Sequence, residues 1–346
     1  MVVHERRDHR IAVPRPDLSD ALGTPNACAA CHRDRGNAWA AAAIASHRSG
    51  RRQGPSGAEL LGPTLWSIRH EQRDAATSLQ ALLANPDVAS LSKATALSAL
   101  ADSAPAAAAA IAEPLLRDGD PWLRLGAVQA LRATSEPTRV RLLASLTSDG
   151  SRAVRRELAP SLANATGAGD IESLLGEYRG WLTANADRAE ALVELASLER
   201  AAGSPSAARA DFERALRRDD SCLVAYLNFA DELRTNGDDA RAETLLRKAG
   251  ALYPGSAEAH FALGMLLVRR GKIASGVSEL GRANELAPDN SRYAYTYGVG
   301  LHSTRQDRRA LITLSDARAR FPDNAPIETA LRALCASVPS PDPRCP

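Results

Sequence analysis

Short apolar segments at helical spacing run from about residue 73 to the end of the chain, and turn-forming residues separate them. Alanine is abundant, whereas aromatic residues make up only 4% of the chain. Small side chains let helices stack closely, so this composition favours helix-on-helix packing over a sheet sandwich. We therefore predict an all-α fold in which a short segment, residues 1–72, precedes an α-solenoid of helical repeats.

The clearest repeat has a period of 34 residues. Three kinds of position recur at this spacing: small residues, turn glycines and large apolar residues. They are Ala196, Ala230, Gly264 and Gly298, then Gly203, Gly237 and Gly271, then Phe212, Leu246, Leu280 and Leu314. The small residues let paired helices approach closely, and glycine allows the left-handed backbone of a turn between helices.

This pattern resembles the tetratricopeptide repeat (TPR) family. The resemblance implies four repeats of two helices each, over residues 189–222, 223–256, 257–290 and 291–324. We expect a partial helical pair before them, a cap helix over 325–337 and a tail over 338–346. The predicted TPR region is therefore 167–337.

Residues 73–166 show a second period, of 31 residues, in which Lys93, Arg124 and Arg155 are equivalent. Each follows a turn that contains Asp and opens an alanine-rich helix, a pattern that resembles HEAT-like repeats. The basic residues could form an anion-binding ladder, or each could pair with the Asp of the preceding turn. We favour the structural alternative.

Cys28, Cys31 and His32 form a C-x-x-C-H motif, the spacing of a covalent c-type haem attachment site. Two thiols three positions apart can each form a thioether to a haem vinyl group, and the adjacent imidazole is placed to ligate the iron. A zinc site that adds His47 and His9 is an alternative, although its spacing is not a standard one. A redox C-x-x-C is a further alternative, but no βαβ pattern surrounds it.

The flanking sequence resembles a family of bacterial multihaem cytochromes c with C-terminal TPR repeats. The resemblance rests on D-H-x-x-x-x-P-R-P-D-L-S at residues 8–19 and on T-P-N-x-C-x-x-C-H at residues 24–32. It implies haem c, further haem motifs upstream and a periplasmic or other extracytoplasmic location. The first residues contain no hydrophobic signal core. We therefore expect Met1 to be an internal methionine, or the chain to be a fragment.

If haem binds, His32 is the predicted proximal ligand. His9 lies in the stretch that resembles the cytochrome family, and we predict it as the distal ligand. His4 and His47 are the alternatives, and His4 or His9 could instead serve a neighbouring haem.

Cys335 and Cys345 lie ten positions apart at the C-terminus, and an exported protein could join them in a disulfide. The formal net charge of +2 gives no electrostatic case for binding nucleic acid or an anionic membrane. No apolar run reaches the length of a membrane span.

The leading functional hypothesis is an exported, c-type cytochrome-like electron-transfer protein whose TPR and HEAT-like surfaces bind a protein or redox partner, or arrange further haems. No hydrolytic signature is present, so we expect a carrier or scaffold more than a catalyst. The alternatives are a TPR scaffold or adaptor without haem, and a fragment of a multihaem oxidoreductase. Residues for partner binding on the concave face, if they are not merely surface or packing residues, are Asn228, Arg234, Arg269, Tyr293 and Tyr295.

Overall fold

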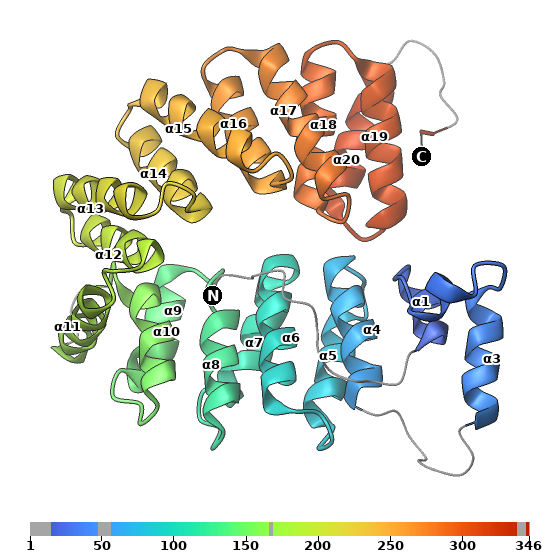
Figure 1. Cartoon of the computed structure of the whole chain (residues 1–346), viewed down its shortest axis with the longest axis horizontal. Coiled ribbons are helices and arrows are strands. Elements are labelled where there is room, and N and C mark those ends of the chain that lie inside the picture. Colours follow the sequence, from blue (N-terminus) through green and yellow to red (C-terminus); the bar gives the residue numbers. More distant parts are fainter. Residues whose placement is uncertain (1–14, 48–56, 166–168, 338–343, 346) are drawn as a thin grey trace.

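The computed structural model describes residues 15–47, 57–165, 169–337 and 344–345, and within these ranges the chain forms helices and no strand. Two arms of stacked helices face each other (Figure 1). The HEAT-like arm consists of α5 to α10, and the TPR arm consists of α12 to α20. Among the described helices, none is long and apolar enough to cross a membrane.

The chain begins with a small group of helices, α1 (Pro16–Leu22), α2 (Cys28–Cys31) and α3 (Asn37–His47), which we call the cysteine module. Gly23, with φ of 65°, ends α1 in the left-handed conformation. Helix α1 packs on α3 and also touches α4. In α3 only Ala40 is buried, although most of this helix is apolar. The module therefore has little core of its own.

The HEAT-like arm follows α4 (Gly57–Arg69). Its helices are α5 (Ala75–Ala84), α6 (Ser90–Ser103), α7 (Pro105–Leu115), α8 (Pro121–Ala130), α9 (Glu136–Leu143) with a 3₁₀ turn (Ala144–Leu146), and α10 (Arg152–Leu162). Helices α6 and α8 pack closely because Gly126 faces the backbone of Ala94: a Cβ atom at residue 126 would lie 2.6 Å from the Cα atom of Ala94.

The basic residues at the 31-residue spacing tie successive turns together. Arg124 donates two hydrogen bonds to the Asp149 carboxylate, at 2.7 and 3.0 Å, and one to the Asp118 carbonyl at 2.8 Å. Arg155 likewise pairs with Glu177 and donates to the Asp149 carbonyl at 2.5 Å. Their role is thus structural. The predicted partner needs correction, because each guanidinium binds a backbone carbonyl of the preceding turn, whereas the carboxylate comes from the element that follows.

Helix α11 (Gly169–Ala184) links the arms. The expected pair of helices before the TPR repeats is therefore a single long helix over the described residues. One cluster of buried apolar residues continues from Ile68 in α4 through α11 to Leu198 in α12. The domain boundary at residue 166 stays a prediction, since this cluster spans it.

The TPR arm has the helical pairs that the 34-residue period predicts. They are α12 (Ala189–Ala201) and α13 (Pro205–Arg218), α14 (Leu223–Thr235) and α15 (Asp239–Leu252), α16 (Ala257–Arg269) and α17 (Ile273–Leu286), and α18 (Ser291–Ser303) and α19 (Asp307–Arg320). The turn glycines Gly203, Gly237 and Gly271 have φ of 75°, 81° and 75°, as expected. Arg305 takes the same conformation in the fourth turn, with φ of 59°.

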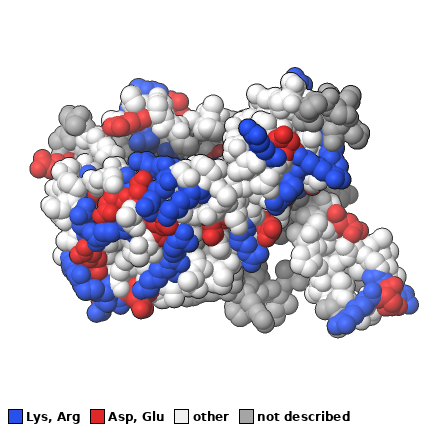
Figure 2. Space-filling view, turned by 90° about the horizontal axis from the view of Figure 1, so that it is seen from above, with Lys and Arg blue, Asp and Glu red and all other residues white. Residues whose placement is uncertain are grey.

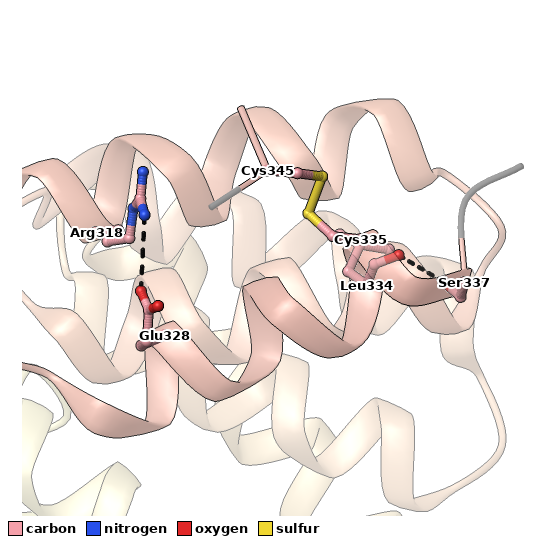
Figure 3. Close-up of a disulfide and its surroundings, with 6 residues drawn as sticks. All are labelled: Arg318, Glu328, Leu334, Cys335, Ser337 and Cys345. Carbon is pink, nitrogen blue, oxygen red and sulfur yellow. Dashed lines mark hydrogen bonds and ion pairs between the residues drawn. A yellow bond between two sulfur atoms is a disulfide. The ribbon is translucent and has the colours of Figure 1, made fainter. Parts of the chain in front are cut away.

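Helix α20 (Ala325–Ser337) covers the end of the TPR arm. Cys335, in its last turn, is joined to Cys345 by a disulfide (Figure 3). Both half-cystines pack against the last apolar cluster of the arm. An ion pair of 3.8 Å between Arg318 and Glu328 also links α19 to this cap helix (Figure 3). The tail is thereby held to the cap at the described Cys345.

Candidate functional site

The first helices of three TPR repeats, α14, α16 and α18, line a cavity of about 520 Å³ on one face of the arm. We call it the TPR groove. Apolar side chains from α14 and α16, among them Leu227, Phe261 and Met265, form much of its wall. Tyr293, at the start of α18, stacks on Phe261 with the ring centroids 4.5 Å apart. The groove is thus an apolar surface built by adjacent repeats.

Large apolar side chains continue along this face at the repeat spacing. Leu227, Phe261 and Tyr295 are equivalent positions, as are Met265 and Val299. Met265 is 43% exposed, Val299 41% and Tyr295 36%. Scattered exposed apolar residues are ordinary on protein surfaces, but a contiguous set beside a cavity is typical of an interaction site.

Three arginines and two acidic residues, Asp231 and Glu258, line the groove beside its apolar wall. Arg234 pairs with Asp231 at 2.6 Å, and Arg269 with Asp239 at 3.3 Å. Arg292 lies over the Phe261 ring, 4.8 Å from its centroid, and none of the described carboxylates pairs with it. An exposed guanidinium above an aromatic ring is therefore available to an acidic group of a ligand.

Part of this groove was predictable from the sequence. Of the residues predicted to bind a partner, Arg234, Arg269 and Tyr293 line it, whereas the exposed Asn228 and Tyr295 are not among the lining residues. Three further residues that shape the groove, namely Phe261, Met265 and Arg292, were not predicted. The 34-residue spacing of the apolar residues Leu227, Phe261 and Tyr295 is the sequence feature that could have indicated this face of the repeats.

The C-x-x-C-H motif forms a separate site in the cysteine module. Cys28 and Cys31 are the first and last residues of α2, and both thiols are free. The Asn26 side chain accepts a hydrogen bond from the Cys28 amide at 2.9 Å and so caps this short helix. His32 is exposed, and its ring lies 4.7 Å from that of Trp39. The Cζ atom of the Arg35 guanidinium lies over the Trp39 ring, 4.8 Å from its centroid.

The donor set of the cysteine module fits a covalently attached haem. Two free thiols sit one helical turn apart, an exposed imidazole follows, and the apolar helix α3 has only one buried residue. His9 and His4 lie outside the described residues, so the distal ligand stays a prediction. His47 ends α3, with its Nδ1 2.8 Å from the Ala43 carbonyl oxygen. The described residues contain no group of three or more side chains placed to hold a metal ion. The zinc alternative also needs His9, so it stays a prediction as well.

Basic and acidic side chains are interspersed over the face of the TPR arm seen in Figure 2. The cysteine module projects at the far right of the same view, the position that α3 occupies in Figure 1. The visible face carries no broad patch of a single sign of charge, which agrees with the near-zero net charge of the chain. Specificity would therefore come from local groups in a site.

The tetratricopeptide repeat family model matches residues 233–299, which include most of the groove. Similar solved structures include YrrB, described as a TPR protein with an unusual peptide-binding site (20% identity, 45% of this chain and 81% of that chain, TM-score 0.39). They also include TTC0263, a TPR protein of Thermus thermophilus (18% identity, 58% and 100%, TM-score 0.38), and MamA of Desulfovibrio magneticus RS-1 (17% identity, 50% and 96%, TM-score 0.39). Comparison with curated proteins gave no significant match.

The assignment of the repeats rests on the family match together with the helix pairs and left-handed turns described above. The family match covers residues 233–299 and does not bear on the cysteine module, so haem, iron and a cytochrome family stay predictions. The chain is a helical-repeat protein that contains tetratricopeptide repeats, a fold suited to protein–protein interaction.

Proposed function

We propose that the protein is an interaction scaffold that binds a segment of a partner protein in the TPR groove. The observation that carries this proposal is the exposed side chain of Met265, which lines a cavity of about 520 Å³ together with Leu227 and Phe261. Burial of apolar surface is the main favourable contribution to most protein association. The family match includes most of the groove, and this supports the scaffold function ahead of electron transfer.

The chemistry of the groove favours a peptide that presents a large apolar side chain next to an acidic one. The apolar side chain would pack against Phe261 and Met265, which line the wall. The acidic side chain would reach Arg292, which has no carboxylate partner among the described residues. A charge-assisted hydrogen bond at that position would set the orientation of the peptide.

A phage-displayed library of random peptides, selected on the purified chain, tests the proposal. We expect selected peptides to combine apolar and acidic residues, and Met265→Asp to weaken their binding by roughly tenfold or more. Val224→Asp is the matched control, because Val224 is 42% exposed on α14 but lies outside the groove. If both variants lost the same affinity for the peptides, a binding site in the groove would be contradicted. Peptides that bind Met265→Asp as tightly as the unaltered chain would contradict it as well.

We further propose that Cys28 and Cys31 carry haem c, with His32 as proximal ligand, in an exported electron-transfer protein. The free thiols on one helical turn and the sparsely covered apolar helix α3 support this second function. Haem, when bound, supplies one-electron redox chemistry. The protein would hold it through two thioethers and an imidazole beside Trp39. The alternative form of this proposal is that the chain is a fragment of a longer multihaem oxidoreductase.

Expression with an export signal and a cytochrome c maturation system tests haem attachment by intact mass. We expect one haem, lost in Cys28→Ala/Cys31→Ala and retained in Cys222→Ala, whose thiol is buried elsewhere. A low-spin spectrum that becomes high-spin in His9→Ala would support His9 as distal ligand. A colourless, folded protein would contradict the haem proposal and leave the scaffold function intact.

A further inference from the structure

The turn that follows α4 contacts the far end of the TPR arm. His70, Glu71 and Arg73 meet the loops before α18 and α20. The hydrogen-bonded pairs, which involve Glu71 and Arg73, lie 220 to 253 residues apart in the chain. Figure 1 shows the end of α4 opposite α18 and α20. This contact, which we call the clasp, closes the two arms into a ring.

Glu71 is the centre of the clasp. Its carboxylate accepts one hydrogen bond from the Ser291 hydroxyl and another, of 2.6 Å, from the Asn324 side-chain amide. These donors begin the last TPR repeat and the cap helix, so one side chain bridges two units of the other arm. Glu71 also has φ of 53°, a left-handed conformation in which glycine is the usual residue. The carboxylate gives a reason for a non-glycine residue at this strained position.

Contacts on both sides of Glu71 reinforce the clasp. The Arg73 guanidinium pairs with Asp323 at 2.5 Å. The His70 ring stacks between Trp66 and Phe321, with centroid distances of 4.3 and 6.3 Å. Its Nε2 also lies 3.8 Å from the Asp289 carboxylate. The clasp thus combines hydrogen bonds, an ion pair and an aromatic stack.

The clasp acts on the loop that shapes one wall of the TPR groove. Asp289 and Ser291 are clasp residues, and Asn290 between them caps α18 by accepting a hydrogen bond from the Tyr293 amide. The next two residues, Arg292 and Tyr293, line the groove. The residues that the turn after α4 contacts are therefore continuous with the residues of α18 that line the groove.

We propose that the clasp regulates the TPR groove: the closed ring holds the first turn of α18 in the geometry that binds a partner peptide, and an open ring binds it more weakly. The inference rests on the proposed scaffold function. By thermodynamic linkage, a bound peptide stabilises the closed ring by the same factor by which closure tightens binding. The turn between α4 and α5 thereby tunes a site to which it contributes no lining residue.

Two single substitutions open the clasp from opposite sides. Glu71→Gly removes the carboxylate while keeping a residue that favours the left-handed turn, so α4 can end as before. Ser291→Ala removes a donor but leaves the Asn290 cap in place. Glu113→Ala on α7 is the control, since Glu113 is an exposed acidic residue far along the chain from the clasp. Small-angle X-ray scattering and hydrogen exchange of residues 289–294 report closure without any peptide.

The expected result is a larger radius of gyration and faster exchange at the start of α18 in both variants, with affinity for a groove-selected library peptide reduced by roughly tenfold. The Glu113→Ala control should match the unaltered chain. If scattering and hydrogen exchange were unchanged in both variants, the claim that the clasp holds the ring closed would be wrong. An open ring with unchanged peptide affinity would overturn the regulation but leave the scaffold function standing. If no library peptide is sensitive to Met265→Asp, the scaffold function fails and the regulation fails with it, whatever the scattering shows.

Discussion

Arg124 and Arg155 of the HEAT-like arm have different surroundings from Arg292 of the TPR arm. In the HEAT-like arm Arg124 and Arg155 lie between successive turns, where backbone carbonyls and carboxylates use their donors. In the TPR arm Arg292 stands exposed over Phe261 at the edge of an apolar groove. Charges satisfied within an arm stabilise stacking, whereas a guanidinium beside exposed apolar surface remains available to a ligand. The contrast fits structural support at Arg124 and Arg155, and it fits the recognition that we propose for the TPR groove.

The largest expected effect comes from glycines at the helix contacts of each arm. At Gly126 a Cβ would strike the backbone of Ala94 at 2.6 Å, whereas at Gly298 it would strike the Leu314 side chain at the same distance. A backbone cannot move aside as a side chain can, so Gly126→Ala should cost about 3 kcal/mol and Gly298→Ala about 1–2 kcal/mol. Gly250→Ala, in open space on α15, should be neutral or stabilising.

Urea unfolding followed by two probes checks this order. All four tryptophans, at residues 39, 66, 122 and 181, precede the TPR arm, so their fluorescence follows the HEAT-like arm and its neighbours. Circular dichroism follows both arms. Because repeat arrays can unfold in parts, the two probes need not coincide. If Gly298→Ala lowered the free energy of unfolding as much as Gly126→Ala or more, the argument that a backbone yields less easily than a side chain would be wrong.

Removing one arginine from each arm sharpens the comparison. Arg124 is 16% exposed and its partner Asp149 is 5% exposed, so Arg124→Ala should cost about 2 kcal/mol by leaving a buried carboxylate unpaired. Arg234 and Asp231 are 40% and 52% exposed, and Arg234→Ala should cost about 0.5 kcal/mol or less. Thermal unfolding of both variants measures the difference. Equal destabilisation would contradict the division of roles.

Acid should weaken the TPR arm through Glu243 on α15. The hydrogen bond from Lys272, with Arg247 and Arg270 nearby and burial acting in the opposite sense, lowers the pKa of Glu243 from 4.5 to about 2. Because the pKa is lower in the folded chain, the stabilisation is present above about pH 4.5 and is lost as the pH falls towards 2.

Denaturant titrations between pH 7 and pH 3 test this contribution, of about 2 kcal/mol at neutral pH. Glu243→Gln should lower stability at pH 7 and flatten the decline in acid. Glu285→Gln is the control, because Glu285 forms only an exposed pair with Arg282. A decline in Glu243→Gln as steep as in the unaltered chain would assign the acid sensitivity to other groups.

The smallest expected effect concerns the turns. Three TPR turns use glycine at a left-handed position, and the fourth uses Arg305, an exposed residue with φ of 59°. Arg305→Gly should stabilise the arm by roughly 0.5 kcal/mol, because relief of strain exceeds the added freedom of the unfolded chain. Gly237→Ala should destabilise the arm. Chemical unfolding measures both, and destabilisation by Arg305→Gly would show that the arginine side chain has a role in the turn.

Local physical rules made much of the architecture predictable. Gly203, Gly237 and Gly271 marked turns because few other residues adopt positive φ, and the small residue at Gly298 marked a close helix contact. The free thiols and the imidazole of the C-x-x-C-H motif follow from the sequence, but the haem they would hold stays a prediction.

The groove and the clasp depend on how repeats stack, so the sequence pattern indicated only part of the groove and none of the clasp. Met265 and Phe261 occupy ordinary apolar positions of a helix, and only the curvature of the array makes them line a cavity. The contact between Glu71 and Ser291 requires small rotations summed over many repeats. Arg124 was assigned to the preceding turn for a similar reason, since its carboxylate partner Asp149 belongs to the next repeat.

The most direct test of recognition by the TPR arm is the methyl NMR signal of Met265. The chain contains two methionines, Met1 and Met265, so ¹³C-methyl-methionine labelling gives a signal inside the groove that Met265→Leu identifies. We predict that a library-selected peptide shifts the Met265 signal in a saturable way while the Met1 signal stays unchanged. A peptide that binds the chain with no change at Met265 would contradict the claim that the TPR groove is the binding site.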